Sequence, residues 1–395
     1  MGRAKTAELP DEYSKRISIS GAQTELQTSI SCTGRIRGVD FGTYRYAYMT
    51  FKFVPCSRSS QRRDDLRILV TGGAGYIGSH CCKVLAANGF DLVVFDNLTR
   101  GHRALAKWGN LVVGDIRDQE SLRNTFRRYR PDAVLHFAAL AYVGESVSDP
   151  DRYFDINTSG TIQLLHAMLE AGVKTIVFSS TCATYGVPAA LPITEQTAQS
   201  PTNPYGLSKL MVERILLTYT SAYGLRAIIL RYFNACGADP EGDVGEIHVP
   251  EPHLIPRALM VAAGQEDAID IFGADYPTRD GTCIRDYIHV SDLAEAHLAA
   301  LQLLLQGGHT MALNLGIGIG FTVREVLQAV ERVTGRNVRV RAAPRRPGDP
   351  PELVADASLA ARLLHVDPKF RGLDTIVQTA WNWHRKLLVN DSLKA

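Results

Sequence analysis

The sequence contains no long apolar run and almost no net charge. No uninterrupted apolar segment approaches the roughly 18 residues of a membrane span, and the first residues lack the apolar core of a secretory signal. The 43 basic and 41 acidic residues leave a formal charge of +2, which gives no electrostatic reason to expect nucleic acid or an anionic membrane as a partner. We therefore expect a cytoplasmic protein that binds a small molecule.

Cysteine is sparse and shows no pattern. The chain has seven cysteines, an odd number, with no CxxC spacing and no metal-like cluster with histidine. This usage is typical of reduced thiols in a cytosolic protein. We also expect no metal site.

The first 65 residues lack any sustained apolar period, and we expect them to form a disordered N-terminal extension. A transit peptide is a weaker interpretation, because Glu8, Asp11, Glu12 and Glu25 are unusual in such acid-poor segments. A mis-assigned translation start would also produce a tail of this kind.

From Leu66 onward, short apolar runs alternate with amphipathic stretches. The runs predict buried parallel strands at 66–70, 91–95, 110–114, 132–137, 175–180 and 225–230. Stretches such as 76–89 and 119–130 predict crossover helices. This alternation predicts an α/β fold, a doubly wound parallel sheet of the Rossmann type. We expect a nucleotide-binding domain at 66–235 and a smaller α/β substrate-binding lobe at 236–395, with about 286–318 returning to the first domain.

A glycine-rich turn follows the first predicted strand. Gly72, Gly75 and Gly78 stand in GxxGxxG spacing where a helix begins. Glycine lets backbone N–H groups approach a pyrophosphate, and the helix N-terminus favours its negative charge. The second strand ends at Asp96, whose carboxylate can accept hydrogen bonds from an adenosine ribose and would repel a 2′-phosphate. Together these features favour NAD over NADP as the cofactor.

Two further predicted strands end where open α/β sheets bind ligands. Asp115 and Ile116 follow the third strand, and Phe137, Ala138 and Ala139 end the fourth. Asp115 could hydrogen-bond an adenine amine. The small side chains would leave room for a cofactor, although plain packing is the simpler explanation for the alanines.

Hydroxyl groups gather where the fifth strand ends, in FSSTCATYG at 178–186. Further along, Tyr205 and Lys209 stand at i, i+4 in a predicted helix that Asn203 could cap, so they share one helix face. An ammonium group close to a phenol favours the phenolate and lowers its pKa from about 10. We therefore predict that Tyr205 acts as a general base, while Thr181 hydrogen-bonds the same substrate oxygen.

These motifs carry a family resemblance. TGGAGYIG, FSSTCATYG, NPYGLSK and LRYFN resemble the extended short-chain dehydrogenase/reductase superfamily. With DNLTRG, HFAALAYVGES, HLIPRAL, IFGADYPTRDGTCIRDYIHV and RRPGDPPEL, the chain from about Leu66 to its C-terminal helix resembles the UDP-glucose 4-epimerase family. The resemblance implies an isomerase of galactose and nucleotide-sugar metabolism, in which tightly bound NAD takes hydride from C4 of the hexose and returns it to the 4-keto intermediate. It also implies a homodimer.

The resemblance further assigns residues. Tyr205 would be the base and acid, Lys209 would lower its pKa and hold the nicotinamide ribose, and Thr181 would align the sugar hydroxyl. Besides these and the turn and strand-end residues above, cofactor contacts would come from Tyr76, Ile77, Asn97, Asn157 and Phe233. The UDP-sugar would be held by Asn234, Leu254, Phe272, Arg285, Arg346 and Asp349, since guanidinium groups match phosphate oxygens bidentately.

Three positions depart from the family pattern. Ala141 replaces a lysine that many members carry, so we expect one cofactor contact to be missing. Thr181 replaces the more familiar serine and keeps the hydroxyl. Leu353 lies near the position where residue size is thought to gate N-acetylated sugars, and its bulk favours plain UDP-glucose and UDP-galactose.

More than one function remains open at this point. An epimerase for UDP-xylose and UDP-arabinose needs the same chemistry. A 4,6-dehydratase is disfavoured, because Cys182 and Ala183 after Thr181 supply no carboxylic acid. A redox enzyme that releases NADH and a non-catalytic NAD-binding regulator could both be built on the same scaffold, and the intact set of Thr181, Tyr205 and Lys209 counts against the regulator.

Overall fold

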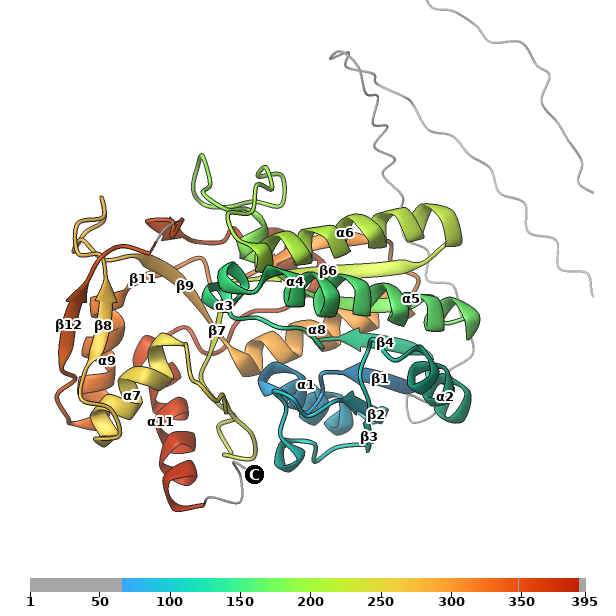
Figure 1. The fold of residues 1–395 in the computed structure, drawn as a ribbon, viewed down its shortest axis with the longest axis horizontal. Helices are drawn as coiled ribbons and strands as arrows, with labels where there is room; N and C mark the ends of the chain where they lie inside the picture. Colours follow the sequence, from blue (N-terminus) through green and yellow to red (C-terminus); the bar gives the residue numbers. More distant parts are fainter. Residues whose placement is uncertain (1–65, 347, 391–395) are drawn as a thin grey trace, which may run out of the picture. The chain divides into compact units, whose positions relative to one another are not determined.

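A seven-stranded parallel sheet carries the nucleotide-site motifs (Figure 1). The computed structural model describes residues 66–346 and 348–390, so the expected disordered extension lies outside the described residues. The strands are β1 (Arg67–Thr71), β2 (Asp91–Asp96), β3 (Asn110–Val113), β4 (Ala133–His136), β5 (Thr175–Thr181), β6 (Arg226–Tyr232) and β10 (Met311–Leu315). All six predicted strands are present, and the doubly wound α/β fold class is confirmed.

The strand order places a ligand crevice at one point of the sheet. The strands run β3-β2-β1-β4-β5-β6-β10, so the order reverses between β1 and β4. Thr71 and His136, the last residues of these two strands, are register partners. In open α/β sheets, ligands bind beyond the carboxyl ends of the strands at such a reversal. The glycine turn begins there, directly after Thr71.

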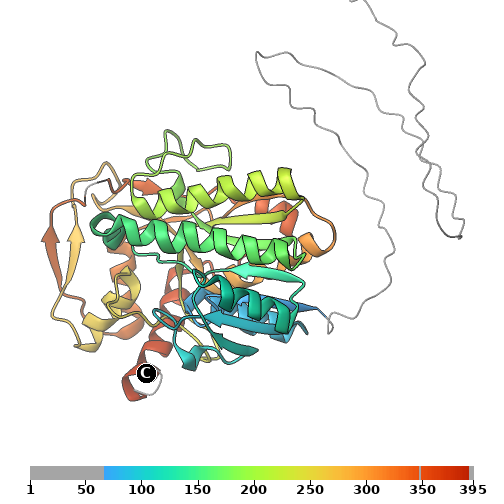
Figure 2. The ribbon, with the colours of Figure 1, turned by 45° about the vertical axis from the view of Figure 1, so that its right-hand side comes forward.

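Helices cover both faces of the sheet because successive strand residues point to opposite sides. Ile68 and Val70 of β1 belong to one apolar core with α1 (Tyr76–Ala87), α8 (Val290–Leu305) and α10 (Ser358–Leu364). Leu69 belongs to a second core on the opposite face with α2 (Gln119–Tyr129), α5 (Gly160–Glu170) and α6 (Pro204–Tyr223). Figure 2 shows α5 and α6 side by side in green.

Most of the later residues form a smaller α/β part with its own core. A four-stranded sheet contains β7 (Asn234–Cys236), β9 (Ile284–His289), β11 (Gly320–Thr322) and β13 (Glu352–Leu353), and β8 (Ile269–Phe272) pairs with β12 (Val340–Ala343). They pack with α7 (Leu254–Ala263), α9 (Val323–Thr334) and α11 (Leu373–Val389). We call this part the lobe. A domain boundary at residues 235 and 236 stays a prediction.

Short helical segments connect β4 to α5: α3 (Val143–Ser148), α4 (Pro150–Tyr153) and a π-helical segment at Phe154–Ser159.

The cysteines in the described part of the chain are buried free thiols, as predicted for these positions: Cys81, Cys82, Cys182, Cys236 and Cys283. Across residues 66–346 and 348–390, no helix combines the length and apolarity that crossing a membrane requires.

Candidate active site

In the glycine turn, two glycines lie so close to neighbouring backbone atoms that a side chain would not fit. Gly72 has a φ of +73°, and a Cβ there would lie 2.5 Å from the backbone nitrogen of Ala138. A Cβ on Gly78 would lie 2.2 Å from the Gly72 carbonyl oxygen. Gly75 is the N-cap of α1, with no side-chain cap and no acidic residue in the first helical turn. The N–H groups that begin α1, including those near Tyr76 and Ile77, therefore fit the pyrophosphate of NAD.

Asp96 is buried at the end of β2. Its carboxylate accepts hydrogen bonds from the backbone N–H groups of Ala74 (3.0 Å) and Leu98 (2.8 Å), and burial raises its pKa. A hollow of about 520 Å³ opens beside it, lined by residues 98–103 with His248 and Val249. Because each carboxylate oxygen can accept a second hydrogen bond, Asp96 keeps capacity for the predicted ribose contact.

Asp115 is already engaged by protein donors. Hydrogen bonding to Arg117 lowers its pKa to about 2, and Asn97 Nδ2 donates to it at 2.8 Å. An adenine amine would have to share this carboxylate. Ile116 is buried in the core with α5, which is a packing role, and its predicted contact with the cofactor stays a prediction.

The residues that follow β4 border the glycine turn. Phe137, Ala138 and Ala139 are half-buried, and the Phe137 ring packs on His297 with 4.9 Å between ring centres. Ala141 is exposed. The backbone of Phe137 and Ala138 packs directly against Gly72, and the contact of these residues with a cofactor stays a prediction.

Asn157 fastens the segment after β4 to α6. Its Oδ1 accepts from Leu140 N at 2.8 Å, and its Nδ2 donates to Leu140 O and to Ser208 Oγ, both at 3.0 Å. The side chain is buried in the π-helical segment. Its amide is therefore used by the protein itself, which supports a positioning role, and direct contact with the cofactor stays a prediction.

The predicted catalytic residues come together at the end of β5. Thr181 is the last residue of β5, and Tyr205 lies in the first turn of α6. The Asn203 side chain accepts from Gly206 N at 2.8 Å, which confirms the predicted cap. Thr181, Tyr205 and Lys209 are all more than nine-tenths buried, and the Thr181 side chain hydrogen-bonds the Tyr205 phenol.

The protein alone does not lower the pKa of Tyr205, contrary to our prediction. Burial raises this pKa to about 12, against the lowering effect of the hydrogen bond with Thr181. Burial also lowers the pKa of Lys209 to about 7, despite the charge of Glu213. The lysine Nζ donates to the Ser179 carbonyl at 2.9 Å. Desolvation is therefore the largest cause of both pKa shifts, and neither residue is among the causes of the other's shift. A phenolate at Tyr205 would be favoured by a positive charge nearby.

A buried ion pair supports this strand end, and the sequence analysis missed it. Glu213 accepts from Ser180 Oγ at 2.5 Å and pairs with Arg231 at 2.6 Å. Both charged side chains are buried. The signal was present in the sequence, because Tyr205, Lys209 and Glu213 recur at four-residue intervals and so share one face of α6.

Residues predicted to hold the UDP-sugar lie mainly in the lobe. Arg285 of β9 forms an ion pair with Asp349, with the arginine side chain mostly buried. The guanidinium carbon of Arg346 lies 3.9 Å from the Phe272 ring centre. Side chains from distant parts of the chain are thereby brought together in pairs.

Four more predicted residues lie where the chain enters the lobe or within the lobe itself. Phe233 and Leu353 are buried in one small apolar cluster with Cys182, the neighbour of Thr181. Asn234 begins β7, and Leu254 begins α7. The cluster links the predicted specificity residue Leu353 to the end of β5.

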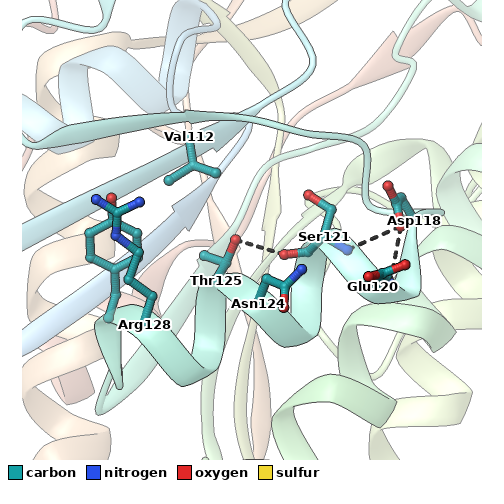
Figure 3. A pocket seen from close by; sticks show the side chains of 8 residues that line it. Val112, Asp118, Glu120, Ser121, Asn124, Thr125 and Arg128 are labelled. Atoms are coloured by element: carbon teal, nitrogen blue, oxygen red, sulfur yellow. Dashed lines mark hydrogen bonds between the residues drawn. The ribbon is translucent and has the colours of Figure 1, made fainter.

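A second hollow, shown in Figure 3, contains none of the predicted site residues. It measures about 330 Å³ and lies along α2. Its polar side chains serve the helix, because Asp118 caps the N–H groups of Glu120 and Ser121 and Thr125 donates to the Ser121 carbonyl. We assign no chemistry to it.

Comparisons with known proteins agree with this arrangement. The model of the NAD dependent epimerase/dehydratase family matches residues 68–316. The UDP-glucose 4-epimerase of Rhizobium meliloti strain 1021 is 52% identical over 319 residues, which cover 81% of this chain and 97% of that protein.

Solved structures are similar as well. The UDP-glucose 4-epimerase of Brucella ovis in complex with NAD has a TM-score of 0.79 and 53% identity, covering 81% of this chain and 98% of its own. The enzyme of Stenotrophomonas maltophila with NAD and formylated UDP-arabinopyranose has a TM-score of 0.79 and 42% identity, covering 82% and 99% of the two chains.

Proposed function

Since the chain belongs to the NAD dependent epimerase/dehydratase family, we propose that it interconverts UDP-glucose and UDP-galactose by epimerisation at C4, with NAD as a bound catalyst. The observation that carries this proposal is the buried set of Thr181, Tyr205 and Lys209 at the end of β5. Strand β5 lies beside β4, and β4 lies beside β1, which leads into the glycine turn. An alcohol oxidation needs a base and a hydride acceptor at one carbon, and this arrangement can supply both.

The chain's residues divide the work of holding the cofactor. The N-terminus of α1 would hold the pyrophosphate, Asp96 and Asn97 the adenosine ribose, and Lys209 the nicotinamide ribose. NAD held by these residues would supply reversible hydride transfer at the sugar carbon, and the positive charge of its oxidised ring would favour the phenolate of Tyr205.

Proton movement falls to the buried hydroxyl groups. Tyr205 takes the proton of the sugar 4-OH and later gives it back, while Thr181 orients that oxygen through its hydroxyl. Burial lowers the pKa of Lys209 to about 7 against the charge of Glu213, and a phenolate at Tyr205 would favour the charged form of this lysine. This division of roles assigns one proton carrier and one orienting group to the same substrate oxygen.

The lobe would bind the UDP portion. We propose that Arg285 and Arg346 contact the pyrophosphate, since their guanidinium groups present paired donors, and that Asp349 accepts from the uridine ribose. Phe272, Asn234 and Leu254 would complete the walls of the sugar-nucleotide site. The ion pair between Arg285 and Asp349 supports this assignment by holding both side chains close together.

One assay tests the function. Purified protein is incubated with UDP-galactose, without added NAD, and UDP-glucose formation and the absorbance of reduced nicotinamide are followed together. We expect product without net NADH. Stoichiometric NADH would show a redox enzyme instead, and no product with bound NAD would favour the regulator. A faster reaction with UDP-xylose than with UDP-galactose would favour the pentose epimerase.

We also propose a homodimer formed through α3 and α6, in the cytoplasm. On α3, Val143 and Val147 are 45% and 65% exposed, and on α6, Leu207 and Met211 are 37% and 40% exposed. Each pair is four residues apart and so forms one apolar stripe, and α3 packs next to α6. Light scattering should give twice the chain mass, and Val147→Lys with Met211→Lys should give the monomer mass.

A further inference from the structure

Two glutamates and two histidines converge in the loop that joins β7 to α7, drawn in yellow in Figure 1. They are Glu246, His248, Glu251 and His253, in the spacing Glu-x-His-x-x-Glu-x-His. One ligand atom from each lies within 4.8 Å of all the others. This loop is separate from the residues that carry the proposed proton transfer.

The ligand atoms are close enough to share one small cation. Nδ1 of His253 lies 2.7 Å from Glu246 Oε1 and 2.8 Å from Glu251 Oε1. Nδ1 of His248 lies 3.0 Å from Glu246 Oε1 and 3.5 Å from Glu251 Oε2. A tetrahedral Zn²⁺ with bonds of about 2.0–2.1 Å places neighbouring ligand atoms roughly 3.3 Å apart, which is within the observed spread.

Burial makes a positive charge at this centre necessary. The side chains of Glu246 and Glu251 are each only 8% exposed, and two buried carboxylates are costly without a partner of opposite sign. Protons on the two imidazoles are one source of that charge. A divalent cation is the other source.

The orientation of His248 favours the cation. Its Nδ1 is buried and has no hydrogen-bond partner, although a Glu246 oxygen lies only 3.0 Å away. A hydrogen bond between the two groups would require the N–H of His248 to point at the Glu246 oxygen. Ligands of one metal instead approach each other closely while their lone pairs point at the common centre. His253 Nδ1 does form a hydrogen bond with Glu251 Oε1 at 2.8 Å, whereas His248 Nδ1 contacts Glu246 without that alignment, as expected for two ligands of one metal.

We propose that Glu246, His248, Glu251 and His253 form a structural Zn²⁺ site. Two imidazole nitrogens and two carboxylate oxygens suit Zn²⁺, whereas Mg²⁺ and Ca²⁺ prefer oxygen ligands alone. Four protein ligands leave no open position, which is typical of a structural zinc. The sequence predicted no metal site because cysteine patterns are the usual signal of structural zinc, and this spacing uses none.

The ion would brace the loop against both the cofactor region and the lobe. The Tyr142 ring packs edge-on against His248 and His253, with ring centres 5.7 and 6.0 Å apart. Trp383 Nε1 of α11 donates to the Glu246 carbonyl at 3.0 Å. His253 directly precedes Leu254, so zinc would also fix the start of α7.

A neighbouring acidic group supplies a matched control. Asp239, Glu241 and Asp243 also converge, but Lys83 Nζ already bonds all three carboxylates at 2.6 to 2.9 Å. Their charge is met by the lysine, and they need no metal. Asp243→Asn should therefore leave the zinc content unchanged.

The test measures zinc in the full chain, purified without chelators and dialysed against Zn²⁺, by mass spectrometry of the metal. We expect about one zinc per chain in the wild type, in Asp243→Asn and in His309→Gln, which changes an exposed histidine outside the loop. We expect at least a tenfold lower content in His248→Gln and in Glu251→Gln. Zinc absent from the wild type, or equal in all variants, would overturn the site.

A second measurement uses the wild type alone, so a variant that fails to fold does not weaken the test. Co²⁺ exchanged into the protein should show the strong visible absorption of a four-coordinate ion, and Zn²⁺ should abolish it. A six-coordinate spectrum, or no stoichiometric binding, would contradict the proposed ligand set. Neither measurement depends on epimerase activity, so failure here leaves the proposed function standing.

Discussion

The large sheet and the lobe position their site residues in different ways. In the sheet, Thr181 and Asp96 are simply the last residues of buried parallel strands, so the strands themselves fix where the side chains lie. In the lobe, Arg285 depends on Asp349, which is 64 residues away along the chain. Regular strands thus position chemistry locally, whereas the lobe relies on contacts between distant segments. Substitutions in the sheet and in the lobe test this difference.

The largest expected effect is at the strand end itself. Tyr205→Phe removes the proton carrier and keeps the ring, so kcat should fall by about 10²- to 10⁴-fold, while the bound NAD and the circular dichroism spectrum stay unchanged. Turnover of UDP-galactose measures the loss. Tyr223→Phe, at the exposed end of the same helix, is the control, and full activity in Tyr205→Phe would refute the assigned role.

The buried ion pair between Glu213 and Arg231 should contribute strongly to the stability of the fold. Arg231→Met leaves the Glu213 carboxylate buried without its partner, which we expect to cost about 3–5 kcal/mol in the free energy of unfolding. Arg123→Met breaks the half-exposed pair with Glu170 and should cost much less, because solvent screens exposed ion pairs. Urea unfolding of both variants compares them. Equal losses would mean that the buried pair does not support the sheet as described.

The lobe should control binding rather than chemistry. Arg285→Ala removes a charge-assisted contact worth about 1.5–3 kcal/mol, so calorimetry should show UDP binding weakened by about 10- to 100-fold. The NAD content should not change. Arg341→Ala, which breaks an exposed ion pair with Asp270 in the same lobe, should bind UDP normally. Lost NAD with unchanged UDP affinity would reverse the proposed assignment.

Acid should weaken the sheet through His136. Burial, and then the charge of Lys209, lower its pKa from 6.5 to about 3, and its ring nitrogens meet the hydroxyls of Thr71 and Thr161 at 2.6 and 2.8 Å. Between about pH 6.5 and pH 3, His136 is therefore protonated in the unfolded chain but neutral in the folded chain. This contribution to stability is complete above pH 6.5 and is lost as the pH falls toward 3.

Unfolding in urea at pH 6.5 and pH 5 checks this expectation. The stability difference between the wild type and His136→Gln should shrink by about 1–2 kcal/mol at the lower pH, given about 1.4 kcal/mol per pH unit for one proton. His309→Gln, at an exposed position, should follow the wild type. A difference independent of pH would show that His136 is not kept neutral.

The smallest expected effect concerns sugar choice where sheet and lobe meet. Leu353 packs with Phe233 in one buried cluster, so Leu353→Ala should make room and raise the turnover of UDP-N-acetylglucosamine relative to UDP-glucose by about tenfold. Initial rates with both substrates measure the ratio. Comparable rates already in the wild type would remove the proposed role of Leu353.

The sequence was informative wherever one segment carries the signal. Buried strands show as apolar runs, and the glycine turn and the Asn203 cap are recognised from a few adjacent residues. By contrast, β13 contains only two residues and β7 and β11 three each, too few to show a period. The pairing of Glu213 with Arg231 and the convergence of the Glu246–His253 loop depend on folding. The direction of the Tyr205 pKa also depended on burial, which the i, i+4 spacing does not report.

The position of β10 has a consequence for synthesis of the chain. This strand closes the edge of the large sheet beside β6, yet it leaves the ribosome only after β7, α7, β8, β9 and α8. Until then, β6 presents unpaired backbone groups of the kind that invite aggregation. A chain stalled before residue 311 would therefore be an aggregation-prone intermediate. Chaperones should bind it at the unpaired edge of β6.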